Sequence, residues 1–410
     1  MDFDLILRNA RIGGREETTV DIGVKDGRIA AIEAGLGGAG PVEDAGGRLV
    51  LPGLVETHIH LDKSCVLGRC EMHRGTLDEA IGAVAKAKRA FTEADVYARA
   101  ARTLEMSILQ GTMRMRTHVE VDPRIGLTSV HALRRLREDY AWAIDLELCA
   151  FPQEGLLDDP GCEDVMVAAL EQGATVVGGA PYMDKDSHGQ IARIFALARR
   201  FGVDIDFHLD FGLDPSHLDV EEVCRKTEEF GWGGRVAVGH VTKLSSVAPA
   251  EFAEIATRLA SAGVAVTVLP ATDLFLTGRD HDHDVPRGVT PAHRLLAHGV
   301  TCSVSTNNVL NPFTPFGDCS LVRMANLYAN IAQVGTLPGM ADCLDMVTVH
   351  PAKLMNLKDY GIAPGNPADI VVLGAPSRGE AVAELAPVLT GYKAGMRTFS
   401  RPEPTLFRPG

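Results

Sequence analysis

The chain has 410 residues, 46% of them hydrophobic, and a formal net charge of −14 from 40 Lys and Arg against 54 Asp and Glu. A chain of this length can bury one large core and leave room for a smaller companion domain. The acidic balance argues against a nucleic acid or an anionic membrane surface as partner, and a small-molecule substrate is the expectation.

The eight cysteines are scattered along the chain, and no Cys-x-x-Cys occurs, so neither a zinc ribbon nor a redox dithiol is indicated. The start, MDFDLILRNARI, contains acidic residues and no long apolar stretch, unlike a signal peptide. No run approaches the roughly 18 consecutive apolar residues of a membrane-spanning helix. We therefore expect a cytoplasmic protein with reduced thiols.

The first fifty residues alternate short apolar strands with turns, as in DLILRNARI and VDIGVKDGRIAAIE. A G-x-G-x-x-G spacing, Gly35 to Gly40, is followed by Pro41 and an extended acidic segment. A nucleotide site needs a helix at that point, so this glycine-rich segment is interpreted as a loop.

From residue 53 to residue 359 strand-like runs alternate with amphipathic helices. The eight runs cover residues 54–62, 111–121, 143–152, 174–181, 203–210, 235–242, 264–270 and 301–307. Eight strand–helix repeats close a (β/α)8 barrel of the TIM type, whereas a doubly wound open sheet is the alternative. The count, and the polar residues at the strand ends, favour the barrel.

After the last helix the chain returns to β-like segments, GNPADIVVLGAP and PVLTGYKAG. We expect residues 1–52 and 360–410 to form one small β-sandwich domain, built from both chain ends. The predicted fold is thus α/β, with a barrel over residues 53–359.

Residues suited to metal binding stand where the predicted strands end, which is where such barrels carry their active sites. In VETHIHLDKS, His58 and His60 are two residues apart and therefore share one face of a strand. His208 ends the fifth strand and His240 the sixth. Converging histidines with one open position are typical of a catalytic divalent metal, although a lone histidine is more often a core residue.

A second histidine-rich segment, RDHDHDVPRG, contains His281 and His283. Its alternating acidic residues and its place before a barrel helix favour a solvated loop, or a lid over the mouth, over a second metal site.

The segments LPGLVETHIHLDKS, THVEVD, FPQEG, DFHLD, GHVTKLSS and NPFTPFG together resemble the amidohydrolase superfamily, and within it the cytosine deaminases and N-alkylammelide hydrolases. The likeness runs from about residue 3 to about residue 375. It implies one divalent metal, zinc or iron, with His58, His60 and His208 as ligands. It also implies that His240 polarises the leaving group or the oxyanion, and that the family leans toward homo-oligomers.

The same resemblance places Gln153 at the edge of a pyrimidine-like ring and Phe313, in NPFTPFG, beside the substrate. Two positions depart from the pattern. Asn307 stands where the family has a metal-binding aspartate, and an amide is a weak ligand and no base. Phe211 stands where the family has a proton-carrying glutamate.

Three acidic residues are candidates to replace the missing proton carriers. Asp210 is the first, because alternation in the fifth strand places it on the face of His208; Asp273 and Asp184 are the others. The sequence thus predicts a metal-dependent amidohydrolase that cleaves a C–N bond in a small cyclic substrate. The alternative is a divergent barrel that has lost hydrolysis and binds a small ligand, or a lyase or isomerase on the same scaffold.

Overall fold

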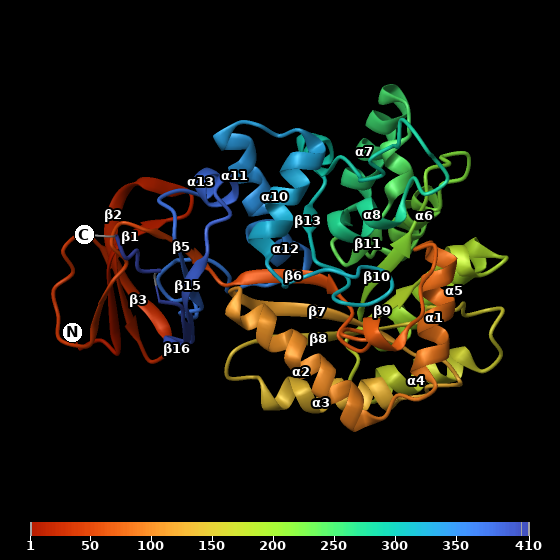
Figure 1. The fold of residues 1–410 in the computed structure, drawn as a ribbon, viewed down its shortest axis with the longest axis horizontal. Helices are drawn as coiled ribbons and strands as arrows, with labels where there is room; N and C mark the ends of the chain where they lie inside the picture. Colours follow the sequence, from red (N-terminus) through yellow and green to blue (C-terminus); the bar gives the residue numbers. More distant parts are fainter. Residues whose placement is uncertain (1, 403, 409–410) are drawn as a thin grey trace.

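The computed structural model describes residues 2–402 and 404–408 (Figure 1). A barrel of strands and helices occupies the right of the view, and a smaller β unit lies at its left. The first strands of the chain belong to the smaller unit, the middle of the chain forms the barrel, and the last strands belong to the smaller unit again.

The barrel is a sheet of eight parallel strands in sequence order from β6 to β13. The strands are Leu54–Ile59 (β6), Thr112–Glu120 (β7), Asp145–Phe151 (β8), Val176–Gly179 (β9), Asp204–Leu209 (β10), Val236–His240 (β11), Val264–Val268 (β12) and Cys302–Val304 (β13). All eight fall within the predicted runs, so the barrel prediction is confirmed.

Hydrogen bonds just beyond the two end strands bring β6 and β13 together. The His60 N–H donates to the Asn307 carbonyl, and the Asn307 N–H donates to the His58 carbonyl, both at 2.9 Å. The residue predicted to end the eighth strand is thereby held between the two histidines of the first.

Helices surround the barrel strands. They are Leu77–Lys88 (α1), Glu93–Leu109 (α2), Thr128–Asp139 (α3), Cys162–Glu171 (α4), Ser187–Phe201 (α5), Val220–Phe230 (α6), Pro249–Ala262 (α7), Pro270–Leu276 (α8), Ala292–Ala297 (α9), Leu321–Ala332 (α10), Leu337–Asp345 (α11), Val349–Leu354 (α12) and, beside the small sheet, Arg378–Ala383 (α13). Short 3-10 turns lie at Leu67–Arg69 (η1), Pro181–Met183 (η2) and Thr242–Ser245 (η3).

Local sequence accounts for these elements. Strand β12, VAVTV, is buried along its whole length, as expected of a parallel strand covered on both faces. Helix α2 starts at the cap Thr92, whose side chain accepts the Asp95 N–H, and helix α5 ends at Gly202 with φ of 67°.

The smaller unit is a mixed sheet with strand order β16-β15-β14-β5-β1-β2-β3, and β4 pairs with β1. Its strands are Leu5–Ile12 (β1), Arg15–Lys25 (β2), Arg28–Glu33 (β3), Val42–Asp44 (β4), Leu49–Pro52 (β5), Ile370–Leu373 (β14), Val388–Lys393 (β15) and Met396–Ser400 (β16). Antiparallel pairing of β14 with β5 joins the two ends of the chain, as the sequence predicts.

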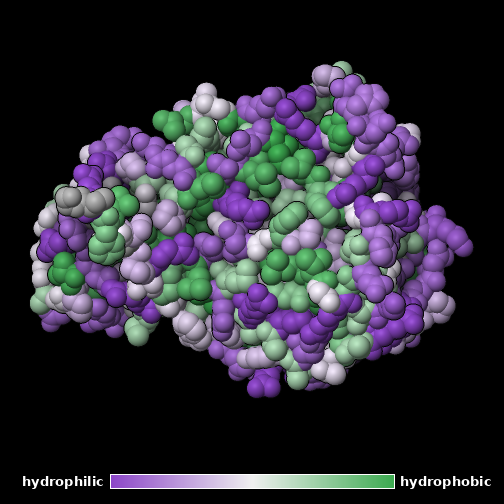
Figure 2. Space-filling view, in the orientation of Figure 1, coloured by the Kyte–Doolittle hydropathy of each residue, from purple (hydrophilic) through white to green (hydrophobic). Residues whose placement is uncertain are grey.

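The surface mixes polar and apolar residues, and Figure 2 shows hydrophobic residues gathered in patches over the middle of this face. Within the described residues no helix is both long and apolar enough to cross a membrane. All eight cysteines are free thiols, most of them buried.

Candidate metal centre

Three imidazoles meet at the carboxyl ends of β6 and β10. The Nε2 atom of His208 lies 3.1 Å from Nε2 of His58 and 3.1 Å from Nε2 of His60. Ligand atoms around a zinc ion at ordinary Zn–N distances lie roughly 3.3 Å apart, so the two separations from His208 suit a shared ion. All three side chains are almost completely buried.

The protonation of these histidines also suits a metal. Burial, followed by the positive charge of neighbouring histidines and Lys63, holds the pKa of His58, His60 and His208 well below the ordinary value. A neutral imidazole keeps a nitrogen lone pair, which is the form that binds metals. Their Nδ1 atoms have no hydrogen-bond partner in the described chain.

Asn307 lies beside the three histidines because its main chain is hydrogen-bonded to those of His58 and His60. Its side-chain Oδ1 is buried and has no hydrogen-bond partner among the described residues. A buried carbonyl oxygen without a partner is costly, and a cation would relieve that cost. The donors therefore fit a divalent metal with three nitrogen ligands and one weaker oxygen ligand.

His240 is fixed at the end of β11 by a buried carboxylate. Its Nδ1 lies 2.6 Å from Oδ1 of Asp273, whose side chain is wholly buried. Burial raises the pKa of Asp273, and the bond to His240 opposes that rise. If Nδ1–H donates to the carboxylate, Nε2 keeps its lone pair. One ring nitrogen of His240 also lies within 4.8 Å of ligand atoms of His58 and His208.

Asp210 is placed differently from the sequence expectation. Strand β10 ends at Leu209, and Asp210 has φ of 47°, so the alternation of faces stops before it. Its two carboxylate oxygens accept the N–H groups of Asp219 and Val220 at the start of α6, each at 2.9 Å. This geometry supports a helix cap and gives no support to proton transfer.

Asp184, another candidate proton carrier, is also engaged elsewhere. Its carboxylate accepts N–H groups from the loop at residues 156–158, and the Gln190 amide. Of the three acidic candidates, Asp273 is the one that contacts His240.

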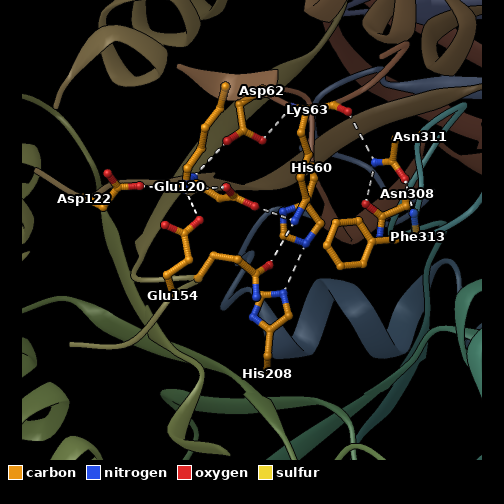
Figure 3. Close-up of polar contacts among 12 residues, drawn as sticks. His60, Asp62, Lys63, Glu120, Asp122, Glu154, His208, Asn308, Asn311 and Phe313 are labelled. Carbon is orange, nitrogen blue, oxygen red and sulfur yellow. Dashed lines mark hydrogen bonds and ion pairs between the residues drawn. The ribbon is translucent and has the colours of Figure 1, made fainter. Parts of the chain in front are cut away.

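Sequence reasoning missed Lys63, which the structure places at the wall of the site (Figure 3). Its ammonium donates to Oε1 of Glu120 at 2.6 Å and to Oε1 of Gln153 at 3.0 Å, and lies 4.2 Å from the centre of the Phe313 ring. The signal was available, because Lys63 follows the His-x-His pair by three residues. A buried lysine nevertheless depends on partners from β7 and the β8 loop, far away in sequence.

Glu120 is shared between two buried lysines. It also accepts from Lys88 of α1 at 3.3 Å, and Lys88 in turn contacts Asp122 at 2.6 Å and Glu154. Figure 3 shows the three carboxylates, of Glu120, Asp122 and Glu154, close together. Burial alone would raise the pKa of Glu120, but Lys63 and Lys88 hold it below the ordinary value. The carboxylate is therefore ionised and fixes both lysines.

A cavity of about 20 Å³ lies in front of the histidines. Its lining consists of His60, Lys63, Leu77, Gln153, Tyr182, His208, Phe211, His240, Thr272, Leu276, Asn307, Asn308 and Phe313. This volume holds about one water molecule, so a ring-sized ligand needs apolar side chains such as Leu77 of α1 to move. Phe211 meets His240 edge-on, with ring centres 5.1 Å apart.

The predicted site residues therefore divide into two groups. His60, His208, His240, Asn307, Gln153 and Phe313 line this cavity and His58 lies against His208, whereas Asp210 does not line it. His283 is exposed, and His281 lies on the wall of a separate cavity of about 610 Å³ between α8 and α10.

Comparison with known proteins gives matches over nearly the whole chain. N-isopropylammelide isopropyl amidohydrolase of Pseudomonas sp. (strain ADP) is 30% identical over 406 residues, 96% of each chain. Pterin deaminase of Rhizobium rhizogenes is 30% identical over 364 residues, 87% of this chain and 82% of that one.

Among solved structures, 5-methylcytosine deaminase from Klebsiella pneumoniae liganded with 5-fluorocytosine superimposes with a TM-score of 0.94. The two chains are 31% identical, with coverage of 98% of this chain and 99% of that one. The sequence model of the amidohydrolase family matches residues 98–385. The chain therefore belongs to the amidohydrolase family.

Proposed function

We propose that this protein is a metal-dependent hydrolase that cleaves a C–N bond in a small heterocyclic substrate, by deamination or amide hydrolysis. The observation that carries the proposal is the convergence of three neutral imidazole Nε2 atoms in a buried pocket at the mouth of the barrel. Membership of the amidohydrolase family supports it.

His58, His60 and His208 would hold one divalent metal, zinc or iron, with Oδ1 of Asn307 as a weaker fourth ligand. When bound, such an ion lowers the pKa of a water molecule toward neutrality and so supplies a nucleophile. Asn307 contributes no negative charge, so the nucleophile's proton must pass to another residue.

His240 is the residue that we assign to proton movement. Its Nδ1 is occupied by Asp273, so Nε2 is free to accept a proton from water and to return it to the departing nitrogen. The buried carboxylate of Asp273 fixes the orientation of the ring. This arrangement would replace both proton carriers that Asn307 and Phe211 have removed.

Lys63, Gln153 and Phe313 would orient the substrate. Gln153 accepts a hydrogen bond from Lys63, which leaves its amide N–H groups as donors. The ring of Phe313 provides an apolar face against which a flat heterocycle can pack. Phe211, Leu77 and Leu276 would exclude bulk water once the substrate is bound.

The metal content of protein purified without chelators, and turnover of a substrate panel, test this proposal. The panel follows the compounds that the relatives' names contain: 5-methylcytosine, N-isopropylammelide and pterin. We expect about one equivalent of metal per chain and hydrolysis of at least one panel member. His208→Gln should lose the metal, and Asp273→Asn should keep the metal but lower kcat.

The matched control is His298→Gln, which removes an exposed histidine away from the site. It should keep both metal and activity. Protein that takes up no metal, or that carries metal but hydrolyses nothing across a wider set of amidines, lactams and aminated heterocycles, would contradict the proposal.

Asn307 and Phe211 favour one second candidate, a barrel that binds a small heterocycle without hydrolysing it. A rise in melting temperature with a panel compound, without turnover in metal-loaded protein, would move this candidate to first place.

A further inference from the structure

A second group of metal-binding side chains lies on the surface, away from the cavity in front of His208. His188 stands in the first turn of α5, and His217 and Asp219 lie in the segment between β10 and α6. Within the described chain one atom of each of these three residues lies within 4.8 Å of the other two.

The geometry centres on one carboxylate oxygen. Oδ1 of Asp219 lies 3.1 Å from Nε2 of His217 and 3.6 Å from Nε2 of His188. The two imidazole rings face each other with centres 5.9 Å apart and an angle of 24° between their planes. Both imidazoles therefore direct the same nitrogen toward one oxygen.

The carboxylate is held in place and the imidazoles are accessible. The Asp219 side chain is 5% exposed, whereas those of His188 and His217 are 54% and 60% exposed. The Ser187 hydroxyl donates to Oδ1 of Asp219 at 2.8 Å, and the Asp219 N–H is bound by Asp210. Lys243 donates to the His217 carbonyl at 2.7 Å, which fixes the main chain of that histidine.

We propose that His188, His217 and Asp219 form a second metal site, specific for a divalent transition ion such as Zn²⁺. Two imidazole nitrogens and one carboxylate oxygen are a ligand set for zinc, nickel or copper, whereas Mg²⁺ and Ca²⁺ prefer oxygen ligands. The present separations of 3.1 and 3.6 Å bracket the roughly 3.3 Å expected around zinc. Solvent supplies the remaining ligand on the exposed side.

An ion at this position joins the segments that follow β9 and β10. Those segments also carry Tyr182 and Phe211, which line the cavity in front of His208. Occupancy of the surface site therefore restrains two walls of the cavity, and we expect it to stabilise the protein against heat. His188, His217 and Asp219 are not among the proposed ligands of the catalytic metal, so the surface site is independent of the proposed function.

The test is a count of bound Zn²⁺ per chain, by equilibrium dialysis of the full-length protein and elemental analysis. The variant His188→Gln/His217→Gln removes two exposed side chains and leaves Asp219 and its supports in place. We expect this variant to bind about one Zn²⁺ fewer than the wild type, and its melting temperature to rise less on addition of Zn²⁺ than that of the wild type.

The matched control is His281→Gln/His283→Gln, which removes two histidines from another surface loop. It should bind as many ions as the wild type, and excess Mg²⁺ should displace none of them. Equal zinc content in the wild type and His188→Gln/His217→Gln would overturn the proposal, as would loss of the ion in the control or displacement by Mg²⁺.

Discussion

Asn307 would supply the one oxygen ligand in the proposed set of metal ligands, and its amide is neutral. Its main chain is hydrogen-bonded to His58 and His60, which fixes its position beside them, and its side-chain Oδ1 is buried. A neutral amide is therefore fixed at the position where a negative ligand would hold the ion more strongly.

Asn307→Asp should raise the affinity for Zn²⁺ by about 10- to 100-fold, which is the size of effect that changes next to a metal commonly have. The physical reason is the added negative charge on an oxygen that now lacks a partner. Competition with a chelator measures the change. Asn308→Asp is the control, because the Asn308 Oδ1 already accepts a hydrogen bond from the Asn311 amide. An equal gain in Zn²⁺ affinity in that variant would contradict the assignment of Asn307 as a metal ligand.

The negative charge of Glu120 contributes to the stability of the fold, because this carboxylate lies between two buried lysines. Glu120→Gln would leave both ammonium groups without this carboxylate and should cost about 3–5 kcal/mol in the free energy of unfolding. Denaturation by urea measures the loss. Glu229→Gln, which removes an exposed partner of Arg225, should cost less than about 1 kcal/mol.

Glu120 should also make the free energy of unfolding depend on pH. The pKa of Glu120 is lowered in the folded protein, so the folded state binds fewer protons than the unfolded state in the acidic range. Its contribution to stability is complete above its ordinary value of 4.5 and is lost as the pH falls through the lowered folded value. Between pH 7 and pH 3 the free energy of unfolding should therefore fall more steeply with decreasing pH in the wild type than in Glu120→Gln. Urea denaturation at a series of pH values measures the difference.

At the level of elements, the start of α6 depends on Asp210, whose carboxylate accepts two N–H groups of its first turn. Asp210→Ala should destabilise the protein by about 1–2 kcal/mol through loss of this cap, and Asp210→Asn should cost less because one oxygen remains. Both variants should keep their metal and their turnover. Loss of turnover in Asp210→Asn at unchanged stability would instead restore the proton-transfer role expected from the sequence.

Helix α1 contributes to the cavity wall through Leu77 in its first turn. At its other end Lys88 is anchored among Glu120, Asp122 and Glu154. Leu77→Ala should widen the entrance and let a chelator remove the metal several times faster. Leu109→Ala, a change of an exposed leucine at the end of α2, should leave that rate unchanged.

At the scale of the whole molecule, we propose that residues 1–52 and 360–410 fold as one unit with the barrel of residues 53–359. Strand β14 pairs with β5 through four residue pairs, and it buries Ile370, Val372 and Leu373. A chain that ends at residue 368 loses β14, β15 and β16. Each buried aliphatic side chain contributes about 1.5–3 kcal/mol, so the loss is comparable with the whole stability of a typical protein.

We therefore expect the chain that ends at residue 368 to be insoluble or to melt far below the wild type. A chain that ends at residue 402 retains every described strand and should melt like the full-length protein. Melting curves of the two proteins, side by side, measure the difference. Equal melting temperatures would contradict the proposal that the small sheet and the barrel fold as one unit.

The barrel, the small sheet built from both chain ends, and the histidines at the strand ends could all be predicted from the amino-acid sequence. The physical reason is local: burial on both faces selects continuous apolar strands, and a period of two fixes which side chains share a face, as it does for His58 and His60. His208 lies on β10, which does not pair with β6, so its contact with His58 and His60 requires the closed barrel.

The pairing of the buried polar groups could not be predicted from the sequence, because it depends on how distant segments meet in the fold. Lys63 meets Glu120 and Gln153, and His240 meets Asp273, across strands that are far apart in the sequence. Asp210 leaves the predicted face because a positive φ ends the strand before it. Alternation along a strand holds only while the backbone stays extended, and the residues that matter most for chemistry lie where it stops.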